Sequence, residues 1–201
     1  MDFFHFEIKD IHGHTFDFEK LKGAKCFLIV NVASQWGLTK SNYTALSQIY
    51  AELAEEGLEI LGFPCNQFGS QEPWPEDKVL EFVQKNFNVK FPMFSKIDVN
   101  EPGTHPLYQY LKNNKVFKHA NELICKNEVI EDIPWNFAKF LVDKHGKVTH
   151  YYGPKVHPDN IVPDIKKHLS HWKKFETTDR SLWIAWVWCS KFDEHRMKKL
   201  I

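Results

Sequence analysis

The spacing of apolar residues predicts several β-strands in the first third of the chain. Apolar and polar residues alternate over residues 4–8 and again over 16–18, on either side of the turn residues 10–13, which predicts an N-terminal β-hairpin. Residues 26–33 and 58–63 are nearly continuous apolar runs. Such runs are typical of strands covered on both faces, so two buried strands are expected here.

Helical spacing follows each of these buried runs. Thr39 is the expected N-cap of a helix whose apolar residues recur every three or four positions, until Gly57 ends it. Pro75 and the acidic residues after it open a second helix, because proline and acids favour a helix N-terminus. We also expect a short helix over 105–112 and a last helix that begins at Pro158.

The remaining segments complete the sheet. Residues 94–99 are expected to form a third buried strand, and 137–142 and 148–152 a hairpin around the turn at 143–146. Residues 115–134 show no apolar period, which predicts a loop. Strands joined by a helix pair in parallel, while the late hairpin adds antiparallel strands. The predicted fold class is therefore α/β, with a central mixed β-sheet flanked by helices on both faces.

Composition and charge narrow the class of protein. The chain has 201 residues, 43% hydrophobic and 26% charged, which indicates a globular domain and excludes intrinsic disorder. Lys and Arg number 26, as do Asp and Glu, so no net charge draws the chain to nucleic acid, and we expect no nucleic-acid partner. We place one domain at residues 1–172 and regard 173–201, which are rich in tryptophan, as an appended tail.

Neither a secretory leader nor a membrane-spanning helix is predicted. The N-terminal residues lack a basic start followed by an apolar stretch, and no run of about 20 apolar residues occurs. The cysteines are Cys26, Cys65, Cys125 and Cys189, with no Cys-x-x-Cys pair. Such sparse cysteines are typical of a reducing compartment, so we predict a cytoplasmic protein.

Three turns contain the residues that could carry chemistry. Residues 31–39 follow the first buried strand at a helix N-terminus, where the helix dipole favours an anion and lowers the pKa of a thiol. Residues 63–73 follow the neighbouring strand and are rich in amides, which can hold an anionic or oxidised atom. Trp135 and Asn136 precede the late hairpin. Where a nucleophile would fit, the chain has Trp36.

Motifs in these turns resemble those of the glutathione peroxidases, and the resemblance covers residues 4–172. It implies a thioredoxin-like fold and the reduction of hydroperoxides by thiols. The motifs occur in the family's order: Asn31-Val32-Ala33-Ser34 with Gly37 and Thr39, Gly62-Phe63-Pro64-Cys65-Asn66-Gln67-Phe68-Gly69 with Gln71-Glu72-Pro73, Phe91-Pro92-Met93-Phe94, His105-Pro106-Leu107-Tyr108, and Trp135-Asn136-Phe137.

By this resemblance the catalytic positions are Trp36, Gln71, Trp135 and Asn136, with Trp36 at the place of the family's selenocysteine or cysteine nucleophile. The nucleophile would attack the peroxide O–O bond, and the indole and amides would polarise it and stabilise the leaving oxygen. Glutathione or another thiol would then reduce the oxidised centre. The implied substrates are hydrogen peroxide and organic or lipid hydroperoxides, including those of membranes. No bound cofactor and no metal are implied.

The chain departs from the family's pattern at further places. Residues 83–87 lack the resolving cysteine of the thioredoxin-dependent members, which favours the selenocysteine type. Tyr151 stands where a basic residue helps to hold glutathione, so the thiol donor stays open. No long oligomerisation insert precedes Trp135, which resembles the monomeric branch that reduces phospholipid hydroperoxides.

Two hypotheses account for Trp36. Selenocysteine is encoded by UGA, which some genetic codes, or naive translation, render as tryptophan. The tryptophans of the tail fit the same origin, since a terminal UGA rendered as Trp172 or Trp183 would extend the chain. In the second hypothesis Trp36 is genuine and fills the pocket, packing on Gln71 and Trp135, in a catalytically inactive relative with a binding or structural role.

Three other features have simpler interpretations. Cys65 could take over the redox role, although a cysteine at a strand end is more often a small buried hydrophobe. His12 and His14 resemble a metal-binding pair but have no third ligand nearby in the sequence. Residues 182–188 and the basic residues after them could form an interfacial anchor, yet their indoles do not keep to one helical face.

Overall fold

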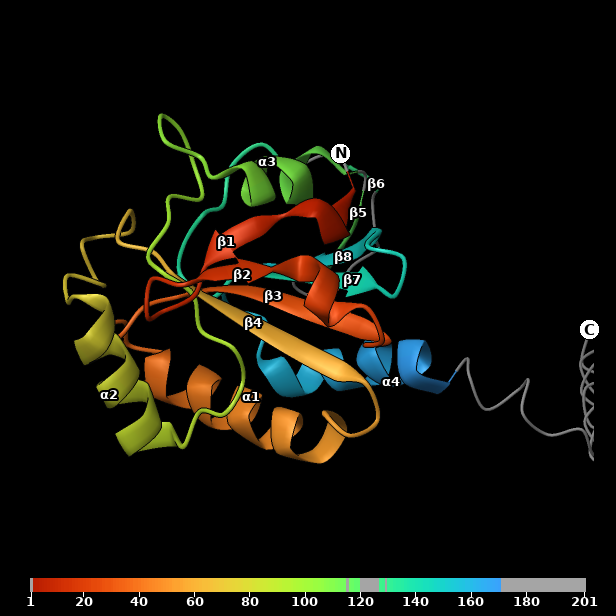
Figure 1. Cartoon of the computed structure of the whole chain (residues 1–201), viewed down its shortest axis with the longest axis horizontal. Coiled ribbons are helices and arrows are strands. Elements are labelled where there is room, and N and C mark those ends of the chain that lie inside the picture. Colours follow the sequence, from red (N-terminus) through yellow and green to blue (C-terminus); the bar gives the residue numbers. More distant parts are fainter. Residues whose placement is uncertain (1, 115, 120–126, 129, 171–201) are drawn as a thin grey trace, which may run out of the picture. The chain divides into compact units, whose positions relative to one another are not determined.

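The computed structural model describes residues 2–114, 116–119, 127–128 and 130–170. Its main sheet has the strand order β4-β3-β7-β8-β5-β6, and β1 and β2 form a separate two-stranded sheet (Figure 1). The strands are β1 (Glu7–Lys9), β2 (Thr15–Asp17), β3 (Cys26–Val32), β4 (Leu58–Pro64), β5 (Val116–His119), β6 (Asn127–Glu128), β7 (Lys139–Asp143) and β8 (Val148–Tyr152).

The sheet is mixed, as the sequence predicts. β3 pairs in parallel with β4 and antiparallel with β7. β7 and β8 form the predicted antiparallel hairpin, β5 adds to β8 in parallel, and β6 is antiparallel to β5. The helices are α1 (Thr39–Leu53), α2 (Glu76–Phe87), α3 (Pro106–Asn113) and α4 (Val162–Ser170).

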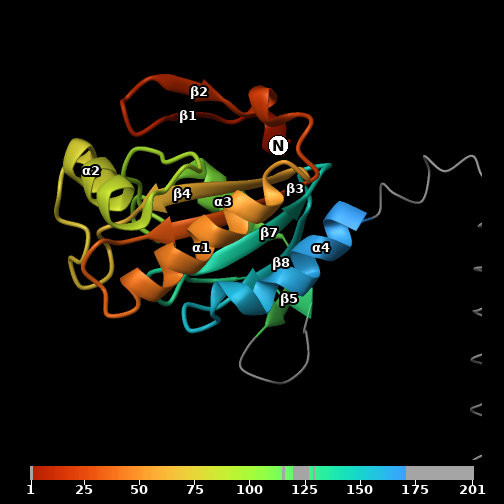
Figure 2. The ribbon, with the colours of Figure 1, turned by 90° about the horizontal axis from the view of Figure 1, so that it is seen from below.

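Both faces of the sheet are covered, and β3 shows why its sequence is continuously apolar. Every residue of β3 is buried. Leu28 and Val30 join one apolar cluster with residues of α1, α2 and α4, while Phe27 and Ile29 join another with residues of α3 and the N-terminal hairpin. Figure 2 shows α1 and α4 on the same face of the sheet. Because successive side chains of a strand point to opposite faces, a strand covered on both needs apolar residues throughout.

The predicted strand at 94–99 is wrong. Phe94 forms an isolated bridge with Asp10, and Met93 forms one with Gly62. The backbone of this segment then bonds to different partners in turn, since Ser95 donates to the Lys9 carbonyl and Ile97 to that of Pro64. Phe94 and Val99 are buried, whereas residues 95–98 are partly buried or exposed, and the backbone follows no single neighbour long enough to form a ladder.

The predicted loop at 115–134 is wrong in part, because β5 and β6 lie within it. Strands of two to four residues are too short to show a period of two in a sequence. Residues 115, 120–126 and 129 lie outside the described residues.

Several boundaries also differ from the prediction. The first hairpin strand is shorter than predicted, because residues 3–5 form a 3-10 turn, and the second ends one residue earlier, because residues 18–21 form another. The last helix starts with a 3-10 turn over 158–161, before α4. Leu38, not Thr39, is the N-cap of α1. The tail and the domain boundary at 172 lie outside the described residues, so both stay predictions.

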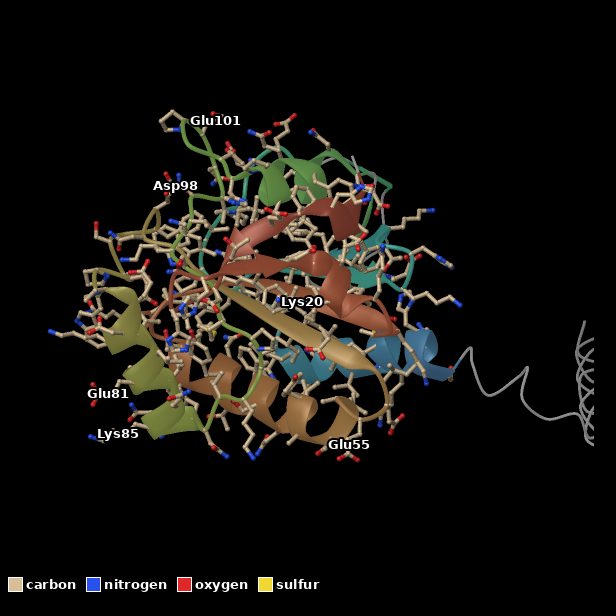
Figure 3. All side chains as sticks on the ribbon, in the orientation of Figure 1. Lys20, Glu55, Glu81, Lys85, Asp98 and Glu101 are labelled. Atoms are coloured by element: carbon tan, nitrogen blue, oxygen red, sulfur yellow. The ribbon has the colours of Figure 1, made fainter. Side chains whose placement is uncertain are left out.

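The described surface carries charges of both signs. The labelled side chains in Figure 3, which include Lys20, Glu81, Lys85 and Glu101, are exposed. Within the described residues, no helix is long and apolar enough to cross a membrane.

Packing beside β4 gives a stability prediction. A Cβ atom at Gly62 would lie 2.5 Å from Met93 Sδ and 3.2 Å from Phe91 Cε2. We expect Gly62→Ala to lower the free energy of unfolding by about 1–3 kcal/mol, because overpacking displaces neighbours. Urea unfolding measures this, with Gly153→Ala as the matched control, since a Cβ there meets nothing within 4 Å. Equal stability of the two variants would contradict the packing argument.

Candidate active site

The turn that carries position 36 is closed by the side chain of Thr39. Thr39 Oγ1 donates to the Ala33 carbonyl at 2.8 Å and accepts from the Trp36 N–H at 3.1 Å. The Thr39 N–H in turn donates to the Trp36 carbonyl at 3.0 Å. These bonds hold position 36 at the N-terminus of α1, where the helix dipole favours negative charge.

The turn after β4 lies beside this one. The Cys65 N–H donates to the Val32 carbonyl, and the Gln35 N–H donates to the Gln71 carbonyl, both at 3.0 Å. Gly69 has a φ of 61°, and a Cβ there would lie 3.6 Å from both Gln71 Cγ and Trp135 Cζ2. Gly69 therefore lies beside both side chains, and its left-handed φ explains why a glycine is favoured there.

The third turn is held by Asn31, a polar residue inside the apolar run of β3. Asn31 Nδ2 donates to the Trp135 carbonyl at 3.1 Å, and the Phe137 N–H donates to the Asn31 carbonyl at 2.6 Å. Asn31 is fully buried. Its side chain thus connects residues 135–137 to β3, where the strand pairing with β7 does not reach, and fixes their distance from β3.

Gln71 and Asn136 meet directly. Asn136 Nδ2 donates to Gln71 Oε1 at 2.8 Å, although the two residues are 65 positions apart. Asn136 is fully buried, whereas Trp135 is 38% exposed and packs on the ring of Phe68, with centroids 5.8 Å apart. The structure therefore brings together three of the four predicted residues: two amides and a partly exposed indole.

Trp36 shares this edge of the sheet through its backbone, but its side chain turns toward α1. Its ring stacks on Phe137 at 5.8 Å and 20°, and Phe137 packs edge-on against Tyr43. The ring on which it stacks is thus that of Phe137, not that of Trp135. Phe137 follows Asn136, so position 36 lies next to the amide pair while its indole belongs to the apolar cluster of the helices.

Glu72 is a buried acid between the first two turns. Its side chain has no exposed surface, and Oε2 accepts a hydrogen bond from Ser34 Oγ at 3.0 Å. Burial raises the pKa of the Glu72 carboxyl to about 7, an effect that the bond from Ser34 and the charge of Lys96 only partly oppose. The sequence places Glu72 in a motif but gives no sign of burial, since acids are usually exposed.

Two other candidates gain no support from their surroundings. Cys65 is fully buried, and burial raises the pKa of its thiol to about 11, which suppresses the reactive thiolate. His12 and His14 lie at the hairpin turn with ring centroids 6.2 Å apart, and His14 Nδ1 is 3.7 Å from Asp10 Oδ2. In the described parts of the chain, no three His, Cys, Asp or Glu side chains form a metal-binding group.

The pKa of Glu72 gives a pH prediction for stability. Between about pH 4.5 and 7 the folded protein keeps a proton that the unfolded chain has lost, so stability falls as the pH rises through this window. Glu72→Gln removes this slope. We expect the variant to gain on the order of 2–3 kcal/mol over the parent between pH 4 and pH 8.

Urea unfolding at several pH values measures this difference. Glu81→Gln, at an exposed position on α2, is the control and is expected to follow the parent at every pH. Parallel pH curves for Glu72→Gln and the parent would contradict a buried, protonated Glu72.

Comparisons with known proteins agree with this geometry. The family model described as glutathione peroxidase matches residues 3–112. A Citrus sinensis protein, named as a probable phospholipid hydroperoxide glutathione peroxidase, is 48% identical over 164 residues, which are 82% of this chain and 92% of that protein. The chloroplastic phospholipid hydroperoxide glutathione peroxidase 1 of Arabidopsis thaliana is 46% identical over 165 residues, 82% of this chain and 65% of that protein.

The fold agrees as well. The crystal structure of Trgpx in its apo form matches with a TM-score of 0.64 and 33% sequence identity, over 84% of this chain and 95% of that one. This match confirms the predicted thioredoxin-like fold. With a matching family model, relatives of this identity and the same arrangement of strands, the chain belongs to the glutathione peroxidase family.

Proposed function

We propose that this protein is a thiol-dependent peroxidase that reduces hydrogen peroxide and organic or lipid hydroperoxides. The observation that carries the proposal is the 2.8 Å hydrogen bond from Asn136 to Gln71 beside position 36. It joins amides from two distant segments at the edge of the sheet where a helix N-terminus favours an anion. A site that reduces peroxides needs such neutral donors around the reacting oxygen.

The chemistry requires a selenolate or thiolate at position 36. It attacks the peroxide, a chalcogen–oxygen bond forms as the O–O bond breaks, and the alcohol or water leaves with a proton. One thiol then displaces water from the oxidised centre and forms a chalcogen–sulfur bond. A second thiol attacks the sulfur of that bond, a disulfide forms, and the selenolate or thiolate leaves and is restored. Because Gln71 Oε1 is held by Asn136, the Nε2 end of Gln71 is the end that can donate to the reacting oxygen.

We infer that the native residue at position 36 is a selenocysteine read as tryptophan. An indole offers no thiolate or selenolate that attacks an O–O bond and is restored by thiols, yet the relatives of this chain carry the names of peroxidases. Restored there, a selenolate would lie at the N-terminus of α1. A second candidate function, a binding or structural protein with a genuine Trp36, rests on the stacking of Trp36 on Phe137. The names of the relatives do not favour it.

The finer proposal is a cytoplasmic monomer that acts on lipid hydroperoxides and takes electrons from glutathione or another small thiol. The names of the two curated relatives support lipid hydroperoxides as substrates. The free thiols of Cys26 and Cys65 are consistent with a reducing compartment.

Peptide mass spectrometry of the protein from its native source tests the identity of position 36. The tryptic peptide 26–40 is expected to show a selenium isotope pattern. Selenium has several abundant isotopes, and a peptide with tryptophan at position 36 contains no selenium. A peptide mass that matches Trp36 would contradict the selenocysteine hypothesis and favour the inactive relative.

The variant Trp36→Cys tests the rest of the site. We expect it to gain peroxidase activity above the parent, and Asn136→Ala in the Trp36→Cys background to lose about 10- to 100-fold in kcat/KM, because a donor that orients Gln71 is removed. Gln84→Ala, an exposed amide on α2, is the matched control and is expected to change nothing. A Trp36→Cys protein that stays at background would contradict the proposed function.

A further inference from the structure

Glu72 is placed where it can act on position 36 without touching substrate. It follows Gln71 directly, and its carboxyl reaches back to Ser34, two positions before Trp36. The Glu72 N–H donates to Asn66 Oδ1 at 2.9 Å, which fixes the backbone from which the side chain starts. The acid is therefore anchored at both ends in the turn after β4 and the turn after β3.

Two bonds run side by side between these turns. The Gln35 N–H donates to the Gln71 carbonyl at 3.0 Å, and Ser34 Oγ donates to Glu72 Oε2 at 3.0 Å. The first is a backbone bond that any residues could make, whereas the second depends on these two side chains. Together they connect two adjacent residues of one turn to two adjacent residues of the other, directly before position 36 in the chain.

Burial favours the neutral form of Glu72, and the groups that face it only partly oppose this effect. Tyr43 of α1 is fully buried, and the charge of Glu72 adds to burial in raising the pKa of its hydroxyl. Lys96 is the cation whose charge reaches Glu72, but its Nζ donates to the Trp74 carbonyl at 2.8 Å. No cation lies within ion-pair distance of Glu72 among the described residues. Glu72 Oε1 and the Tyr43 hydroxyl are both buried without a hydrogen-bond partner in this part of the structure.

We propose that Glu72 is a positioning residue for the peroxidase reaction: through its bond from Ser34 it holds the turn of position 36 against the turn of Gln71. This proposal rests on the proposed function, because it names a further residue of the same site. A buried acid with one hydrogen bond and no ion pair costs stability. Its place in the fold is explained if the bond sets the distance between the nucleophile and the amide pair.

The test separates the bond from the charge in the Trp36→Cys background. Ser34→Ala removes the bond and keeps the carboxyl, whereas Glu72→Gln keeps an acceptor for Ser34 and removes the charge. We expect Ser34→Ala and Glu72→Ala each to lower kcat/KM by about 10-fold, mainly through kcat, because a displaced nucleophile loses alignment. The kcat/KM of Glu72→Gln in this background is expected to stay within about twofold of that of Trp36→Cys alone at pH 7. The glutamine would thus restore what Glu72→Ala loses.

A second readout does not require peroxidase activity. Iodoacetamide alkylation of the introduced thiol, measured from pH 5 to 9 by mass spectrometry of peptide 26–40, reports its pKa. We expect Ser34→Ala to slow alkylation at pH 7 by about threefold, because the loosened turn leaves the helix N-terminus, while Glu72→Gln does not slow it. Cys26 in the same peptide is fully buried, and burial raises the pKa of its thiol to about 12, so we expect little alkylation there. Fragment masses distinguish alkylation at Cys26 from alkylation at position 36.

Tyr50→Phe is the matched control. It removes a hydroxyl-to-carboxyl bond of 3.2 Å, from Tyr50 to Glu59, away from both turns, and is expected to leave the alkylation profile unchanged. If the alkylation profile of Ser34→Ala in the Trp36→Cys background superimposes on that of Trp36→Cys alone, the proposal is overturned, whatever the peroxidase result. If Trp36→Cys itself shows no peroxidase activity, the proposed function fails, and the alkylation profiles still decide the role of Glu72.

Discussion

The candidate site depends on the register in which β3 pairs with its two neighbours. Val32 lies opposite Pro64 of β4 in the parallel pair, and Val30 lies opposite Lys139 of β7 in the antiparallel pair. The turns after β3 and β4 and the turn before β7 therefore all reach the same edge of the sheet. A slip of one residue would reverse the faces of β3 and separate these turns, because side chains alternate along a strand.

Buried polar residues then fix the turns at that edge. Asn31, Glu72 and Asn136 are all buried, and each bonds across to a different segment. Each also has one buried oxygen without a hydrogen-bond partner in the described structure. Such oxygens cost free energy that a core of apolar residues would not. Their concentration between the turns is what a site held in a defined geometry requires, since apolar contacts alone do not fix direction.

Position 36 and Cys65 show how burial decides reactivity at one edge of a sheet. Both follow buried, parallel-paired strands, but Cys65 lies in the apolar cluster on one face, where burial raises the pKa of its thiol. Position 36 lies one turn further from the sheet, at the N-terminus of α1, with its backbone bonded to Thr39. An anion is disfavoured at the first place and favoured at the second. The geometry thus selects position 36, whatever residue occupies it.

The sequence by itself determined β3 and β4, the helices after them and the late hairpin, because burial on two faces leaves a continuous apolar run and a helix leaves apolar residues every three or four positions. Its motifs also pointed to Gln71, Trp135 and Asn136. It missed β5 and β6, which are too short to show a period, and it predicted a strand at 94–99 where the backbone forms only an isolated bridge. Only the tertiary structure decided that Trp36 stacks on Phe137, that Glu72 is buried and that Ser34 bonds to it. These contacts join residues far apart in the chain. The sequence around a polar residue does not show whether its side chain bonds to water or to a distant segment across the edge of the sheet.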